Sequence, residues 1–511
     1  MPSLIGIDIG LTYAKTVIFD ADGAQLAVAR MKVPQSQAKP RWVERDMDEL
    51  WRIAVLSIRQ AVAACGRQPS DIAAVAVTAH GDGLYLLDAE NRPVRPGILS
   101  LDSRAGEIAD GWKADGTAAE ALRVTGQEPH ASAPSALLAW VKRHEPASYR
   151  RIRSVLACKD WLRFRLTGSV GTDHTEASTS FSDCRTQGFS ADALAIFGLG
   201  EMAESLPKVS LSHAIVGGIS REVVAETGLA AGTPVAAGLH DVTASALGVG
   251  GHEPGLLAII AGTYSINEIV STAPAIDRRW YCRNGILPGT WNNMAISPAS
   301  SANYEWFLET LCRADQEKAD REGTSIHQLL AAEMETAKRS ATVIFHPFLF
   351  GSPYGSLASA SLFGLRGWHD RGDILNGLLE GVVFNHRTHI DALRSKFGAA
   401  EARIAGGVSR NPAIAQLFAD ALGLPMLTTE SDEAGALGAA LCAGAGVGLY
   451  DDPVSAARKA VRVRSRYLPD ARRKAYLDRK YELYCHLADA MQPLWPAIDL
   501  IDDQAKAELR P

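Results

Sequence analysis

The chain has 511 residues, of which 47% are hydrophobic and 22% charged, and its formal net charge is −6. Because a single hydrophobic core stops growing near about 250–300 residues, this length favours two large domains. The charge gives no basic stripe for nucleic acid, so we expect no nucleic-acid partner. No apolar run reaches the roughly 18–20 residues that cross a bilayer, and the start of the chain does not read as a secretory signal, so we expect no membrane partner.

The seven cysteines are scattered along the chain and form no C-x-x-C pair. This spacing argues against a zinc site or a disulfide framework and is typical of proteins in a reducing cytosol. We therefore expect a cytoplasmic protein.

A β-hairpin is the first predicted element. Residues 4–20 read LIGIDIGLTYAKTVIFD, two apolar strand-like runs around a turn that contains Gly10 and Thr12. A glycine turn lets backbone N–H groups approach phosphate oxygens, and Lys15 adds a positive charge. Asp8, at the end of the first strand, could hold the water shell of a magnesium ion. The alternative is a surface hairpin with a stray acidic residue.

Strands and helices then alternate. A helix is predicted over 47–63, followed by a buried strand over 72–78, and the turn at 80–83 leads into a second strand over 84–87. Apolar residues at helical spacing also predict a helix over 378–393. This alternation favours an α/β fold with helices layered on sheets.

An aspartate, Asp241, lies between a predicted strand over 234–238 and a small, helix-prone run over 242–247. An isolated aspartate at such a junction is more often a helix N-cap than a functional group. The functional interpretation gains weight because a second hairpin of the phosphate-binding type follows closely.

That second hairpin, residues 256–270, reads LLAIIAGTYSINEIV and repeats the layout of the first, with Gly262 in the place of Gly10. The echo predicts two domains of similar construction, with a boundary near 248–253. The alternative is a chance match, because short motifs of this kind recur in unrelated chains.

Paired glycines form the third motif. Gly406 and Gly407 follow a predicted strand over 402–404 and precede Asn411 and a helix. Such a turn allows a flat ligand such as adenine to lie against the backbone, although a lone Gly-Gly pair is a weak signal and an ordinary strand-to-helix turn is the alternative. Small residues over 433–440 predict close helix packing.

In order and spacing, these motifs resemble the FGGY family of carbohydrate kinases, within the superfamily that also holds actin and hexokinase. The resemblance extends from about residue 4 to about residue 485. It implies an α/β fold with two ribonuclease-H-like domains flanking a deep cleft, whose closure would exclude water. It also implies a sugar-binding N-terminal domain over 1–248, a nucleotide-binding C-terminal domain over 249–490 and a tail over 491–511.

The resemblance assigns roles to the matching residues, with ATP and Mg²⁺ as cofactors. Asp241 would be the catalytic base that accepts the proton of the sugar hydroxyl, and Asp8 and Asp241 would hold the magnesium ion. Together with Asp241, the substrate would contact His80, Gly81, Asp82 and Asp102. The residues implied for ATP are Thr12, Lys15, Gly262, Thr263, Ser301, Glu305, Gly406, Gly407 and Asn411.

Three departures from the family pattern leave the substrate open. Leu11 stands where the family usually has Thr or Ser, and Ser100 stands where many members have Trp. Residues 351–355, including Ser352, read GSPYG where many members carry a Gly-Glu-Arg run.

The sugar-gripping segments, residues 80–88 and 97–104, look most similar to the L-xylulose kinase branch of the family. An acid facing the sugar, Asp82, suits a polyhydroxylated ligand and argues against a sugar acid. The resemblance thus implies ATP-dependent phosphorylation of a terminal hydroxyl of a ketopentose such as L-xylulose. The alternatives are a D-xylulose kinase, a polyol (erythritol or glycerol) kinase and a non-enzymatic, nucleotide-binding sugar sensor. Dimers are common in the family, and a homodimer is a further expectation.

Overall fold

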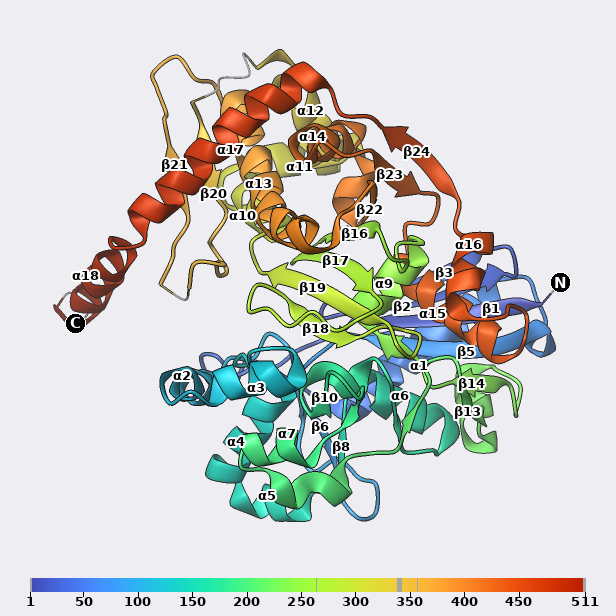
Figure 1. Ribbon diagram of the computed structural model, residues 1–511. Helices are drawn as coiled ribbons and strands as arrows, with labels where there is room; N and C mark the ends of the chain where they lie inside the picture. Colours follow the sequence, from blue (N-terminus) through green and yellow to red (C-terminus); the bar gives the residue numbers. More distant parts are fainter. Residues whose placement is uncertain (1, 263, 338–341, 356, 509–511) are drawn as a thin grey trace. The chain divides into compact units, whose positions relative to one another are not determined.

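The computed structural model describes residues 2–262, 264–337, 342–355 and 357–508, whose contacts divide the chain into two compact units (Figure 1). Unit 1 comprises Met1–Ala258, Glu268–Met294 and Thr429–Val463, and unit 2 comprises Ile259–Asn267, Ala295–Thr428 and Arg464–Pro511. Each unit is therefore assembled from segments that are distant in the sequence. The domain boundaries expected at residues 248 and 490 divide the sequence, not the contact-based units, and they stay a prediction. Thr263, expected at the second phosphate turn, lies outside the described residues.

A seven-stranded sheet lies at the centre of unit 1, in the order β13-β14-β5-β1-β2-β3, with β15 also paired to β5. The first three strands are antiparallel neighbours, as the predicted hairpin requires, whereas β5 runs parallel to β1. The strands are β1 (Ser3–Ile9), β2 (Tyr13–Asp20), β3 (Gln25–Lys32), β5 (Ile72–Ala79), β13 (Ile215–Gly218), β14 (Pro234–Ala236) and β15 (Leu239–His240).

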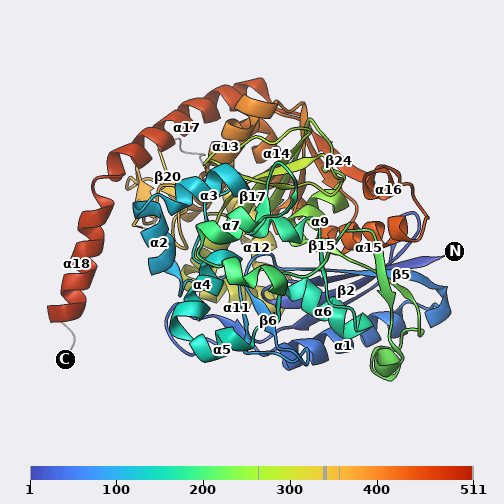
Figure 2. The ribbon, with the colours of Figure 1, turned by 60° about the horizontal axis from the view of Figure 1, so that its bottom comes forward.

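Both faces of this sheet are covered, which explains why β1 and β5 read as nearly continuous apolar runs. Successive side chains of a strand point to opposite faces. Ile5 and Ile7 pack into one hydrophobic cluster with α1 (Met47–Ala64), whereas Leu4 packs into another with α15 (Ala434–Gly446). Figure 2 shows α1 and α15 on opposite sides of β2 and β5.

Helix α15 packs against its neighbours at backbone distance, as the small residues over 433–440 predict. A Cβ atom on Gly438 would lie 1.9 Å from the carbonyl oxygen of Ala244, in α9 (Asp241–Gly248). A Cβ atom on Gly6 of β1 would lie 1.8 Å from the carbonyl oxygen of Ala436. No side chain larger than hydrogen fits at these contacts, so glycine fixes the position of α9 beside α15.

Further helices and short strands complete unit 1. A third hydrophobic cluster, which includes Trp140 and Phe181, lies among them. The helices are α2 (Gly106–Ala114), α3 (Thr117–Thr125), α4 (Pro134–His144), α5 (Pro146–Arg151), α6 (Cys158–Thr167), α7 (Ala191–Ile196), α8 (Val224–Thr227) and α16 (Pro453–Ala460), and the strands are β4 (Glu44–Arg45), β6 (Tyr85–Leu87), β7 (Gly97–Ile98), β8 (Ser154–Leu156), β9 (Thr172–Asp173), β10 (Ser182–Asp183), β11 (Gly188–Phe189), β12 (Val209–Ser210) and β18 (Tyr281–Asn284).

Unit 2 is mainly helical and contains a parallel strand pair, β22 with β23. Its helices are α10 (Ser301–Leu311), α11 (Arg313–Glu322), α12 (Ile326–Thr336), α13 (Arg371–Phe397), α14 (Pro412–Leu422), α17 (Ala471–Met491) and α18 (Trp495–Glu508), and its strands include β20 (Ile344–His346), β21 (Ser361–Phe363) and β22 (Glu401–Ala405).

Some strands contain residues assigned to both units. Two of them, β16 and β17, flank Gly262 and are neighbours in a sheet, which confirms the predicted strand–turn–strand. These strands are β16 (Leu256–Ala261), β17 (Ser265–Ser271), β19 (Trp291–Ser297), β23 (Met426–Thr429) and β24 (Val463–Tyr467). Among the described residues, no helix is long and apolar enough to cross a membrane.

The contact between α15 and α9 gives a test of the fold. Gly438→Ala should lower the free energy of unfolding by about 1–3 kcal/mol or more, because its Cβ meets backbone rather than a flexible side chain. Thermal and urea unfolding measure this. The control is Gly111→Ala in α2, which has open space around its Cβ position and should stabilise by about 0.5–1 kcal/mol. A Gly438→Ala variant as stable as the control would contradict the packing.

Candidate active site

Asp241 is the first residue of α9 and directly follows β15, which pairs with the buried β5. Its carboxylate accepts a hydrogen bond of 2.8 Å from the N–H of the next residue, Val242, and not from a residue further into the helix, as an N-cap would. The side chain keeps 34% of its surface exposed. Burial and the negative charge of Asp8 raise the pKa of Asp241 to about 7. This carboxyl group is therefore a stronger base than an ordinary aspartate.

Asp8 lies near the end of β1, in register with Lys15 of β2 and Thr78 of β5. Burial raises its pKa, while the positive charge of Lys15 acts in the opposite direction. A Cβ atom on Gly435, in the first turn of α15, would lie 2.9 Å from Asp8 Oδ2. The absence of a side chain at that point leaves room for the carboxylate. Unit 1 thus brings Asp8 and Asp241 into electrostatic contact.

In the turn of the first hairpin, Gly10 donates its N–H to the carbonyl of Tyr13, and Thr12 is exposed. Lys15 Nζ lies 3.0 Å from Glu433 Oε2, and the other oxygen of Glu433 pairs with Arg30 of β3. The sequence analysis missed Arg30 and Glu433. No local signal marks them, because Glu433 meets Arg30 from 403 positions away in the chain.

The predicted sugar turn, His80-Gly81-Asp82, follows β5. Gly81 passes so close to His240 that a Cβ atom would lie 2.0 Å from the imidazole Nε2. Asp82 has a left-handed backbone with φ of 56°. Although burial alone would raise the pKa of Asp82, the Arg283 guanidinium and His130 hold it well below its usual range. Its carboxylate is therefore ionised.

Arg283, on β18, connects three residues around this turn. Its guanidinium donates to Asp82 Oδ1 at 3.0 Å, to Gln127 Oε1 at 2.8 Å and towards His240 Nε2 at 3.2 Å. Arg283 is buried, and sequence reasoning gave it no role. Nothing local to Arg283 in the sequence predicts its partners.

Asp102, also predicted to contact the sugar, is held in a buried ion pair. Its side chain is fully buried, with both oxygens engaged by Arg104 at 2.7–3.0 Å and one of them also by the N–H of Val43 at 2.6 Å. Because these groups occupy the carboxylate, the structure gives Asp102 the environment of a structural ion pair and not that of a sugar ligand.

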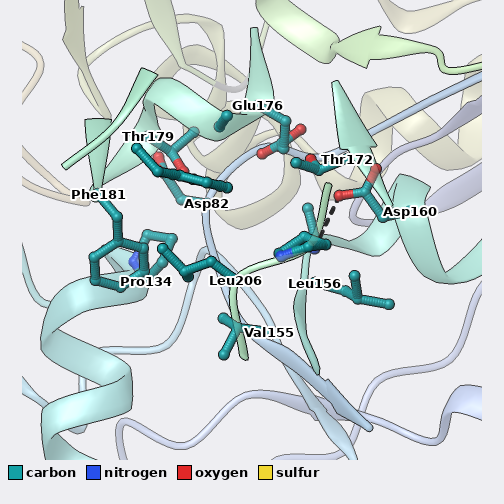
Figure 3. Close-up of a pocket in the computed structure, with 15 residues that line it drawn as sticks. Asp82, Pro134, Val155, Leu156, Asp160, Thr172, Glu176, Thr179, Phe181 and Leu206 are labelled. Atoms are coloured by element: carbon teal, nitrogen blue, oxygen red, sulfur yellow. Dashed lines mark hydrogen bonds between the residues drawn. The ribbon is translucent and has the colours of Figure 1, made fainter. Parts of the chain in front are cut away.

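A small cavity of about 40 Å³ opens beside Asp82 (Figure 3). Figure 3 shows Glu176 and Asp160 on one side of it and the apolar Val155 and Phe181 on the other. Burial raises the pKa of Glu176 well above its usual value. The cavity has room for a few water molecules and combines a polar wall with an apolar wall.

A larger cavity of about 610 Å³ lies within unit 2, and four predicted ATP residues line it: Ser301, Glu305, Gly407 and Asn411. Apolar side chains of α13 and α14 form part of the wall, including Val382, Val383 and Ile414. A volume of this size and mixed lining suits a cofactor-sized ligand. Sequence reasoning missed Tyr304, His327 and Arg410, which also line it.

Hydrogen bonds and close backbone contacts fix the turns next to the residues that line this cavity. Ser301 donates both its N–H and its hydroxyl to the carbonyl of Gly262. Gly406 has φ of 100°, and its Cβ would lie 2.4 Å from the carbonyl oxygen of Ala261, so glycine is required there. Asn411 caps α14 by accepting the N–H of Ala413 at 2.9 Å.

The predicted site residues thus form two groups. Those expected to contact sugar, magnesium ion and first phosphate turn lie in unit 1: Asp8, Thr12, Lys15, His80, Gly81, Asp82, Asp102 and Asp241. Those expected at the second turn and the adenosine lie in unit 2: Gly262, Ser301, Glu305, Gly406, Gly407 and Asn411.

Comparison with known proteins places both groups in one family. Residues 3–248 match the N-terminal domain model of the FGGY family of carbohydrate kinases, and residues 257–447 match its C-terminal domain model. An L-xylulose/3-keto-L-gulonate kinase of Escherichia coli K12 is 32% identical, over 96% of this chain and 97% of the relative. A probable L-xylulose kinase of Pasteurella multocida is also 32% identical, over 96% and 99%.

The fold agrees with this assignment. The crystal structure of a xylulose kinase from Rhodospirillum rubrum superposes with a TM-score of 0.86 at 26% identity, covering 96% of this chain and 99% of that one. The expected α/β fold with two actin/hexokinase-like domains is confirmed. The chain belongs to the FGGY family of carbohydrate kinases, which are ATP-dependent phosphotransferases.

Proposed function

We propose that this kinase transfers the γ-phosphoryl group of ATP to a terminal hydroxyl of a ketopentose such as L-xylulose, with Asp241 as the catalytic base. The observation that carries the proposal is the setting of Asp241, whose pKa is raised to about 7 by burial and by the negative charge of Asp8. The names of the Escherichia coli and Pasteurella multocida relatives support the choice of L-xylulose.

Asp241 would orient the sugar hydroxyl and accept its proton. Phosphoryl transfer passes through a loose transition state in which the attacking oxygen gains charge late, so a carboxylate can serve as the base. With a pKa near 7, the carboxylate binds a proton more tightly than an exposed aspartate, whose pKa is near 4. The backbone N–H of Val242 holds one of its oxygens, which fixes the direction of the other lone pairs.

A magnesium ion would be held by Asp8 and Asp241. The donor set fits, because Mg²⁺ takes one or two carboxylates and completes its shell with waters and phosphate oxygens. The charge of Asp8 raises the pKa of Asp241, so the two carboxylates repel each other in the absence of a cation. When bound, the ion would neutralise charge on the transferring phosphoryl group.

ATP would contact residues of both groups. Thr12 and Lys15 would contact phosphate oxygens at the first hairpin turn, and Gly262 would do so at the second. Ser301, Glu305, Gly406, Gly407 and Asn411 would contact the adenosine, which the 610 Å³ cavity of unit 2 is large enough to hold.

The charges around the sugar turn favour a neutral, polyhydroxylated substrate. Asp82 is ionised and can accept hydrogen bonds from substrate hydroxyl groups, while His80 and Gly81 belong to the same turn. The guanidinium of Arg283 is already paired with Asp82, so it offers no free cation for a substrate carboxylate. This favours L-xylulose over a sugar acid such as the 3-keto-L-gulonate in the name of the Escherichia coli relative. A cytoplasmic location and a homodimer, which the family resemblance implies, remain part of this proposal.

Coupled ADP release with Mg-ATP tests the substrate. The panel comprises L-xylulose, D-xylulose, L-ribulose, D-ribulose, erythritol, glycerol and 3-keto-L-gulonate. L-Xylulose should give a kcat/KM at least about tenfold above the others, because one misplaced hydroxyl leaves a buried polar group unpaired. A preference for the sugar acid would contradict the argument from Asp82, and a preference for a polyol would contradict the ketopentose assignment.

Replacement of the base gives a second test. Asp241→Asn should lower kcat by about 10²–10⁴, the usual contribution of general acid–base catalysis, because an amide accepts no proton. Its Kd for ATP should stay within about threefold, because the adenosine residues belong to unit 2. Stopped-flow turnover and calorimetric ATP titration measure the two quantities.

The matched control is Asp110→Asn, since Asp110 is 73% exposed on α2 and should keep normal turnover. Equal losses of turnover and ATP affinity in Asp241→Asn would show that Asp241 is not the base.

A further inference from the structure

We propose that Arg283 is a positioning residue that fixes the tautomer of His240, so that the imidazole presents its Nδ1–H beside Asp241 as a donor to a substrate oxygen. The inference deepens the proposed function and rests on it for the identity of the substrate. It adds two residues, Arg283 and His240, to the determinants of sugar binding.

The ring of His240 is held in place from its own backbone and from the neighbouring turn. His240 is buried on β15, and its N–H donates to Thr175 Oγ1 at 2.9 Å. Gly81 leaves the space that the ring occupies, since a Cβ atom there would lie 2.0 Å from Nε2. The imidazole therefore packs closely against the Gly81 turn, and the position of its proton remains to be assigned.

The contact with Arg283 determines which ring nitrogen of His240 carries the proton. Arg283 Nη1 lies 3.2 Å from His240 Nε2. Because a guanidinium only donates hydrogen bonds, Nε2 must be the acceptor, and the proton of the neutral ring must be on Nδ1. A ring with its proton on Nε2 would place two donors against each other.

Two further hydrogen bonds fix the orientation of the Arg283 guanidinium. Its Nη2 donates to Asp82 Oδ1 at 3.0 Å, and its Nε donates to Gln127 Oε1 at 2.8 Å. The amide of Gln127 cannot turn without loss, because its Nε2 donates to the carbonyl of Ser178 at 2.7 Å. The guanidinium thus has one orientation, which keeps its Nη1 directed at His240.

His240 Nδ1 is buried and has no hydrogen-bond partner among the described residues. It lies 3.4 Å from Asp241 Oδ1, an oxygen that already accepts the N–H of Val242. A buried donor without a partner is costly, and such groups in native structures call for an explanation. A substrate oxygen beside the reacting hydroxyl would accept a hydrogen bond from Nδ1–H, and it would add no charge next to Asp241.

The tautomer can be measured directly, without substrate. Protein with ¹⁵N-labelled histidine gives separate NMR signals for protonated and unprotonated ring nitrogens, and His240→Gln identifies the signals of His240. We expect Nδ1 protonated and Nε2 unprotonated in the wild type, and a mixture of both tautomers in Arg283→Lys, whose single amine cannot hold all three partners. A wild-type ring protonated on Nε2 would overturn the proposal.

Steady-state kinetics distinguish a role of His240 as hydrogen-bond donor from a role in packing alone. The amide nitrogen of Asn can take the place of Nδ1, whereas that of Gln takes the place of Nε2. We expect His240→Gln to raise the KM for the sugar about tenfold, the value of one hydrogen bond, and His240→Asn to raise it less than threefold, with the KM for ATP unchanged in both. Equal effects of the two substitutions on sugar KM would overturn the donor role.

The two experiments distinguish this inference from the proposed function. The NMR signals do not depend on which sugar is phosphorylated, and the Asn and Gln variants are compared with whichever substrate of the panel turns over. If L-xylulose fails while the tautomer and the Asn–Gln difference hold, the substrate assignment is wrong and the positioning role stands.

Discussion

The partly buried ion pair between Asp82 and Arg283 is the interaction on which the rest of the sugar side depends. Asp82 is held at φ of 56° in the turn after β5, and Arg283 reaches it from β18, 201 positions later in the chain. Removal of Asp82 would leave the buried charge of Arg283 without its ionic partner, and for a fully buried pair such a loss costs about 3–5 kcal/mol. The same guanidinium contacts Gln127 and His240, so the turn, the imidazole and the start of α9 are held as one assembly.

The carboxylates work against the stability of the fold. The pKa of Asp241 rises from 3.8 to about 7 in the folded state. Its contribution to stability is therefore present at pH below about 4 and is lost as the pH rises to about 7. A functional site can retain such a group because a bound cation and a bound hydroxyl would offset the cost. Around the site, the close glycine contacts of α15 and the hydrophobic clusters on both faces of the seven-stranded sheet stabilise the fold.

Local patterns predicted much of the secondary structure. The hairpin of β1 and β2 was predicted at its observed place, and the helix predicted over 47–63 is α1 at Met47–Ala64. The helix predicted over 378–393 extends over Arg371–Phe397. Its first turns were missed because Gly372 and Gly377 weaken the helical pattern, although Asp370 and Asp373 form a capping box that marks the helix start.

The site was predicted where chemistry coincides with a turn and was missed where it depends on long-range pairing. Asp8 lies near the end of β1, Asp82 comes soon after β5 and Asp241 directly follows β15, and the structure brings the three into electrostatic contact within unit 1. Arg283 lies inside a strand, and its partners at 82, 127 and 240 could not be inferred from its neighbours. Asp102 was expected at the sugar from the family resemblance alone, and its ion pair with Arg104, two positions away, is a local contact that the sequence analysis did not consider.

The central claim is that phosphate goes to a primary hydroxyl of the sugar. ³¹P NMR of a reaction with L-xylulose and Mg-ATP tests it most directly, because a phosphate on a CH₂–O group shows a triplet from its two neighbouring protons. The account predicts such a triplet growing in step with ADP. Inorganic phosphate as the only new signal would mean that water is the acceptor, and a doublet would mean transfer to a secondary hydroxyl. Either result would contradict the account.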